Sequence, residues 1–175
     1  SVNAWRNIHH FGMAVREYKV ATYGEYGGLL NRVDVPSDRF FMSWDLRKKP
    51  RRETPAWQTV LSAARPVTRV DAIRLKGRSG FLELEKITGV NLRKEDDILF
   101  VQIPLDFYLM LRETDVEDPD IRRIPLDWRM ETRRAFRHYL AKGYTVIDFF
   151  RAQDTPKRNF YALQKPGGQK KRDRK

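Results

Sequence analysis

The stretch "LDWRMETRRAFRHYLAKGYTVIDFF" (residues 126–150) holds a helix pattern, a stop signal and a strand pattern in direct succession. One stripe of the helix pattern is apolar and recurs at helical spacing: Trp128, Thr132, Ala135 and Tyr139. Asp127 suits the N-cap and Gly143 the C′ position, so the pattern predicts a helix over 127–142. The Val- and Phe-rich run directly after the glycine predicts a strand over 145–150.

Outward from this stretch, helix and strand patterns alternate along the chain. We expect residues 145–150 to pair antiparallel with residues 159–164. An apolar pattern that ends at Gly12 predicts a helix over 1–11, and alternating side chains predict a strand over 39–46. Further short elements are expected at 13–24, 56–64, 66–75, 80–87, 98–104 and 105–114. The order indicates a mixed α/β, α+β-like fold with hairpins.

The composition is that of a globular protein with an uneven charge distribution. Hydrophobic residues make up 41% and charged residues 33% of the 175 residues, and the net charge is +12. Most of the excess lies in two runs, RKKPRR at 47–52 and the tail at 165–175. We expect the tail to be disordered, because it lacks apolar side chains to bury. Both runs suit nonspecific contact with an anionic partner such as nucleic acid.

Several functional classes are excluded or disfavoured by residue type. No apolar run approaches the length of a membrane span, so we expect no membrane contact. The absence of cysteine excludes disulfides and thiol chemistry and is compatible with a cytoplasmic location. Three histidines without H-x-x-x-H spacing give no metal site. We interpret the stripe of Arg129, Arg133 and Arg137 as a solvated helix face, paired with Glu131 or with the acidic turn at 115–120.

Two stretches carry a family resemblance, "SVNAWRNIHHFGMAVREYKVATYG" (1–24) and "LLNRVDVPSDRFFMSWDL" (29–46). They show an N-A-x-x-N helix ending in Gly, a Tyr-containing strand with a Y-G turn, and an L-N…P-S-D-R-F loop before a strand ending W-D-L. The residues concerned are Asn3, Ala4, Asn7, Gly12, Tyr18, Tyr23, Gly24, Leu30, Asn31, Pro36, Ser37, Asp38, Arg39, Trp44, Asp45 and Leu46. In this order they resemble the GCN5-related N-acetyltransferase superfamily, in a bacterial group with a long C-terminal extension.

The resemblance implies that this chain corresponds to the C-terminal half of an acyl-CoA N-acyltransferase fold. Residues 1–46 would be the acetyltransferase-like core, 47–97 an insertion with short strands, 98–164 an α/β extension and 165–175 the tail. The extension would serve as a lid over the acceptor site or as a homodimer surface.

The implied activity is transfer of an acetyl group from acetyl-CoA to an amine acceptor. Ser1, Asn3 and Asn7 would lie on the cofactor side of the first helix.

The Q/R-x-x-G-x-G/A turn that holds the cofactor pyrophosphate in the family does not occur in this sequence. The family's general-acid Tyr is replaced by Ile8, so no catalytic residue can be assigned, and we interpret His9 and His10 as packing or exposed residues. We therefore expect this chain alone to be inactive and to bind acetyl-CoA weakly or not at all. The alternative is a noncatalytic basic binding module.

Overall fold

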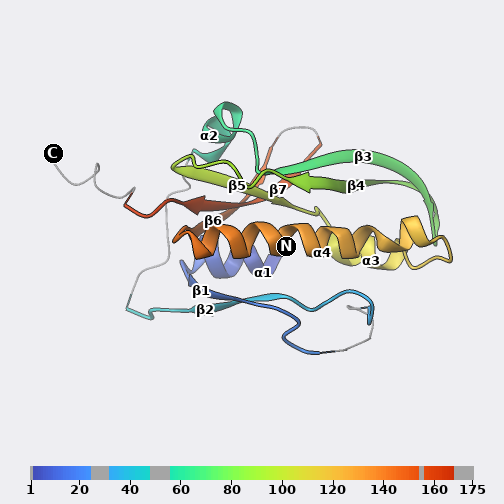
Figure 1. Cartoon of the computed structure of the whole chain (residues 1–175), viewed down its shortest axis with the longest axis horizontal. Coiled ribbons are helices and arrows are strands. Elements are labelled where there is room, and N and C mark those ends of the chain that lie inside the picture. Colours follow the sequence, from blue (N-terminus) through green and yellow to red (C-terminus); the bar gives the residue numbers. More distant parts are fainter. Residues whose placement is uncertain (1, 25–31, 48–55, 154–155, 168–175) are drawn as a thin grey trace.

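The structure is a computed structural model that describes residues 2–24, 32–47, 56–153 and 156–167 (Figure 1). In chain order it contains α1 (Val2–Ala4), the π-helical η1 (Trp5–His10), β1 (Ala14–Lys19), β2 (Arg39–Ser43), α2 (Trp57–Ala63), β3 (Thr68–Gly77), β4 (Gly80–Val90), β5 (Ile98–Ile103), α3 (Phe107–Glu113), α4 (Pro119–Ala141), β6 (Thr145–Ala152) and β7 (Arg158–Gln164). The mixed α/β class is confirmed. So is the helical character of the first segment, although most of it is π-helix rather than α-helix.

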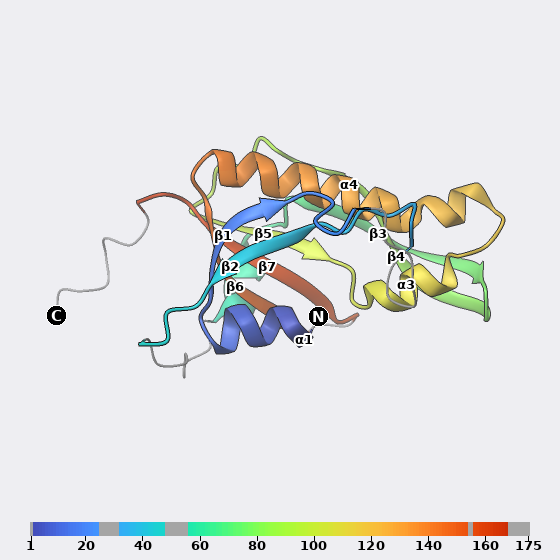
Figure 2. The same cartoon turned by 90° about the horizontal axis from the view of Figure 1, so that it is seen from below.

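The centre of the molecule is the antiparallel sheet β5-β7-β6, covered on both faces. The expected pairing is confirmed, with Thr145 opposite Gln164 and Phe150 opposite Phe160. Alternate residues of each strand face opposite sides. One face packs against α4 through Leu99, Val101, Val146, Phe149 and Leu163, and the other meets α2 through Phe100, Phe150, Phe160 and Ala162. In Figures 1 and 2, α1, η1 and α4 lie on one side of this sheet and α2 on the other.

Two antiparallel hairpins complete the fold. The β1–β2 hairpin lies beneath α4 and the N-terminal helix in Figure 1, and seen from below it crosses between them (Figure 2). Strand β1 also contacts β6. The β3–β4 hairpin extends along α4, and its tip is fixed to the end of α3. There the buried carboxylate of Glu113 accepts hydrogen bonds from the backbone N–H (2.9 Å) and the hydroxyl (3.0 Å) of Ser79. These contacts hold the hairpin against the helical layer.

Helix α4 begins earlier than the sequence pattern predicted. Its N-cap is Asp118, whose side chain accepts from the Asp120 and Ile121 amides, with Pro119 in the first turn. The prediction of Asp127 as N-cap is wrong, because Pro125 is accommodated inside the helix rather than preceding it. The predicted acidic turn therefore includes the first residues of the helix. The end is as predicted, since Gly143 follows the last turn with φ of +82°, a conformation that suits glycine.

Two other boundaries differ from the predictions. The strand expected over 39–46 ends at Ser43, because β1 begins at Ala14, the residue that pairs with Ser43. Trp44 and Leu46 lie beyond the end of the strand and are exposed. Helix α3, within the element expected over 105–114, starts at Phe107 with Asp106 as its N-cap.

The basic runs fall largely outside the described residues. Of 47–52 only Arg47 is described, and of the tail only residues 165–167, where the Lys165 ammonium donates to the Glu95 backbone carbonyl at 3.1 Å. Among the helices that the structure describes, none is both long enough and apolar enough to cross a membrane.

Candidate functional site

His9 lies on η1, against the edge strand of the central sheet. The segment ends with Gly12 at φ +62°, which allows the chain to turn directly into β1. The two adjacent histidines lie in different environments, since His9 is buried and His10 is exposed. The indole of Trp5 stacks on both rings, 5.4 Å from His9 and 5.8 Å from His10 between centroids. π-helical turns are rare and occur frequently at functional sites.

Asp148 meets His9 from strand β6. The register of β6 against β7 shifts between Val146 and Asp148, an irregularity of the kind that redirects a side chain. The Asp148 side chain is fully buried. Its carboxylate accepts from His9 Nδ1 at 2.8 Å, from the Trp57 indole N–H at 2.7 Å and from the Phe149 amide at 2.8 Å. These donors come from η1, α2 and β6, so the carboxylate joins three elements that are far apart in the sequence.

The chemistry of this His9–Asp148 pair follows from the hydrogen-bonding capacity of each group. A carboxylate that accepts from Nδ1 selects, in the neutral imidazole, the tautomer with its proton on Nδ1 and the lone pair on Nε2. A histidine oriented in this way by a buried carboxylate is suited to accept a proton at Nε2, and the carboxylate then stabilises the imidazolium that forms. The pair is therefore a candidate general base.

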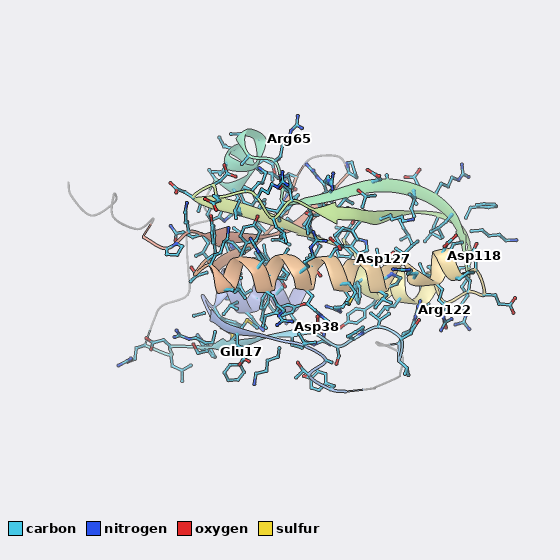
Figure 3. The ribbon with its side chains drawn as sticks, viewed as in Figure 1. Glu17, Asp38, Arg65, Asp118, Arg122 and Asp127 are labelled. Atoms are coloured by element: carbon cyan, nitrogen blue, oxygen red, sulfur yellow. The ribbon has the colours of Figure 1, made fainter. Side chains whose placement is uncertain are left out.

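A second polar network, here called the arginine cluster, comprises Asp38, Arg39, Arg129 and Arg133. Figure 3 shows Asp38 between the β1–β2 hairpin and α4. Arg133 forms a two-pronged ion pair with the buried Asp38 carboxylate, Nε to Oδ2 at 2.8 Å and an Nη to Oδ1 at 2.9 Å. The Tyr18 hydroxyl donates to Oδ2 at 2.8 Å and the Ala21 amide to Oδ1 at 3.0 Å. Burial opposes ionisation of Asp38, but the hydrogen bonds from Arg133, Ala21 and Tyr18 outweigh it and hold the pKa below its usual range.

Arg129 and Arg39 complete the cluster. The Arg129 guanidinium lies 4.7 Å from the Phe107 ring centroid, and burial lowers its pKa. Arg39 donates to the Asp38 backbone carbonyl at 2.8 Å and lies over the Tyr23 ring. The interpretation of the Arg129, Arg133 and Arg137 stripe as a solvated face is therefore wrong for its first two members. The β1–β2 hairpin covers this part of α4 and supplies Asp38, and only Arg137 is exposed.

The structure describes two of the three cofactor-side residues that the family resemblance implies. Ser1 lies outside the described residues, Asn3 is exposed and Asn7 is partly exposed. Ile8 is 1% exposed in the core, so it offers no polar group to a site. A hollow of about 340 Å³ lies elsewhere, between α4 and the β3–β4 hairpin, and is lined by charged side chains that include Arg69, Glu131 and Arg134. Within the described ranges, no group of three or more His, Asp or Glu side chains could hold a metal ion.

Sequence reasoning did not single out Asp148 or Trp57. A signal for Asp148 is present, since it is the one charged residue within the apolar run "YTVIDFF", and a carboxylate at a core position needs donors. Trp57 carries no comparable signal. Its role depends on the packing of α2 against β6, which no local pattern specifies.

Comparison with known proteins adds no relative from which a function could be transferred. No protein-family model, no curated protein and no solved structure matches this chain.

Proposed function

We propose that this chain contributes to an N-acyltransferase-like site in which His9 is the general base. The single observation that carries the proposal is the buried 2.8 Å contact between His9 Nδ1 and the fully buried Asp148 carboxylate. The resemblance of residues 1–46 and 98–164 to acetyltransferases supports the choice of reaction. His9 directly follows Ile8, the position at which many members of that family carry their general acid.

His9 would act on the proton that the acceptor amine loses. As the amine nitrogen bonds to the acyl carbon of a thioester, Nε2 takes one proton from that nitrogen while Nδ1 stays hydrogen-bonded to Asp148. When the carbon–sulfur bond breaks, the imidazolium gives the same proton to the departing sulfur. The amide and the free thiol are the products, and His9 returns to its starting form.

The described residues do not fit the pyrophosphate of acetyl-CoA. The glycine-rich phosphate turn of the family is missing from the sequence, and the α-helical part of the first segment is only Val2–Ala4. Asn3 and Asn7 stay proposed contacts on the cofactor side. We infer that this chain alone binds acetyl-CoA weakly and is inactive with that cofactor, whereas a small thioester, which needs no pyrophosphate site, is a substrate with which acyl transfer by this chain can be measured.

The test is thiol release from S-acetyl-N-acetylcysteamine, which lacks the nucleotide and pyrophosphate, in the presence of a panel of primary amines. General-base catalysis typically contributes about 10²- to 10⁴-fold, so His9→Gln should lower the enzyme-dependent rate by about 100-fold or more. His10→Gln is the matched control, because His10 is the exposed neighbour and should retain the rate. Circular dichroism verifies that both variants are folded.

Equal rates for His9→Gln and His10→Gln would overturn the assignment of His9. No acceleration over buffer by the unchanged chain with any amine would overturn the acyl-transfer proposal. In that case salt-sensitive retention of the chain on DNA would favour the alternative of a basic binding module.

A further inference from the structure

The arginine cluster holds more positive charge than its own carboxylate can neutralise. Among the residues that the structure describes, Arg39, Arg129 and Arg133 lie around one acid, Asp38. Each Asp38 oxygen already accepts two hydrogen bonds. Oδ1 receives the Ala21 amide and Arg133, and Oδ2 receives Tyr18 and Arg133. Asp38 is therefore saturated by donors other than Arg129, and two positive charges are in excess.

Arg129 lies near Asp38, but among the described residues it makes no ion pair or direct hydrogen bond with that carboxylate. Its Nε is buried and has no hydrogen-bond partner among the described residues. The contact with the Phe107 ring engages the guanidinium as a cation and supplies no acceptor for an in-plane N–H. A buried donor without an acceptor is unfavourable, and a charged one more so, which makes this position unusual for a group with a purely structural role.

The cluster is also accessible from solvent. Arg39 is exposed, the Arg133 side chain keeps 17% of its surface exposed, and Arg129 itself is only partly buried. The exposed Tyr23 ring lies 5.6 Å from the Arg39 guanidinium carbon. A small ligand can therefore approach the two cations that Asp38 leaves unneutralised.

We propose that Arg129, together with Arg39 and Arg133, binds the oxyanion group of a small ligand, a carboxylate or a phosphate. A guanidinium presents its N–H groups as a planar fork that matches these groups, and charge-assisted hydrogen bonds to them are stronger than neutral ones. An oxyanion would supply Arg129 with an acceptor and the cluster with the missing negative charge. The proposal does not depend on acyl transfer, because neither His9 nor Asp148 takes part.

The test is calorimetric titration of the full chain with inorganic phosphate and, separately, with acetate at constant ionic strength set by sodium chloride. The anion that binds with the lower dissociation constant identifies the oxyanion class. Arg129→Met should weaken the affinity for the preferred anion by about tenfold or more, because it removes one charge-assisted hydrogen bond. Arg137→Met is the matched control, an exposed arginine on the same helix, and should leave binding unchanged.

Thermal unfolding provides a second measurement. Without the anion, Arg129→Met should be as stable as the unchanged chain or more stable, because it removes a buried, uncompensated charge. If Arg129→Met does not fold, Arg39→Gln tests the same site from its exposed side and should also lower the affinity for the anion. Equal affinity in the Arg129→Met or Arg39→Gln variant and the Arg137→Met control, or no affinity for either anion in the unchanged chain, would overturn the proposal.

Discussion

Replacing Asp38 by Asn should destabilise the protein by about 3 kcal/mol at neutral pH. The substitution keeps the shape of the side chain but removes its charge, and it takes from the three arginines the acid that the described residues supply. Removing one partner of a buried ion pair costs about 3–5 kcal/mol. The Asp38 side chain is fully buried, whereas Arg133 is 17% exposed and can recover some hydration, so the lower end of the range applies.

The assay is thermal and urea unfolding of the Asp38→Asn variant beside a Glu17→Gln control. In a protein of this size, about 1 kcal/mol corresponds to about 2–4 °C, so the midpoint should fall by roughly 6–12 °C. Glu17 lies on the same hairpin but is exposed (Figure 3). Its carboxylate oxygen lies 3.7 Å from Lys19 Nζ, and such a surface ion pair contributes at most about 1 kcal/mol to stability. A midpoint change in Asp38→Asn no larger than in the control would refute the reasoning.

The pH dependence adds an independent signature of the same ion pair. The folded-state pKa of Asp38 lies below its unfolded value, so the folded state releases this proton more readily. The ionised Asp38 carboxylate therefore contributes its full stabilisation at pH values above its unfolded-state pKa. This stabilisation is lost as the pH falls through its folded-state pKa. The acid limb of the stability curve should be shallower in Asp38→Asn than in the unchanged chain.

Two further changes test other parts of the fold. Burial raises the pKa of Tyr161 to about 12 from 10.0, so stability should fall as the pH rises from 10 towards 12, and Tyr161→Phe should reduce that loss in alkaline unfolding experiments. A Cβ at Gly77 would meet the Glu113 carbonyl oxygen at 2.9 Å and Leu82 Cδ2 at 2.7 Å, so Gly77→Ala should cost about 1–3 kcal/mol by urea unfolding. Lys76 is the exposed neighbour, and the control variant Lys76→Ala should have a free energy of unfolding within about 0.5 kcal/mol of that of the unchanged chain. A loss as small as this in Gly77→Ala would show that the hairpin tip moves freely.

Periodic patterns predicted the central part of the fold well, because burial there is decided by neighbours a few residues apart. Trp128, Thr132, Ala135 and Tyr139 are all buried, as their helical spacing indicated. The β6–β7 pairing follows from two apolar runs joined by a short connection. Boundaries were less predictable. Asp127 was the predicted N-cap, yet α4 continues through Pro125 to an N-cap at Asp118.

The polar networks could not be predicted, because each joins residues far apart in the sequence. Arg133 and Asp38 are 95 positions apart, and His9 and Asp148 are 139 apart. A helical stripe of arginines is compatible with a solvated face until a hairpin from another part of the chain covers it. The sequence shows which side chains can form such pairs, and the topology selects the partners.

The two networks also explain how the N-terminal segment is held in place. A short π-helix and a two-stranded hairpin are not stable alone in water, so η1 and β1–β2 depend on the body of the protein. Apolar contacts such as Phe40 with Phe136 and Tyr161 provide burial but little direction. His9–Asp148 and Asp38–Arg133 are directional, and each connects this segment to a different element, β6 or α4. Two such points fix the orientation of the segment, whereas one would leave it free to pivot. A loss of activity in His9→Gln therefore identifies a base only if anion binding at the arginine cluster is unchanged in the same variant, because a displaced segment would weaken both.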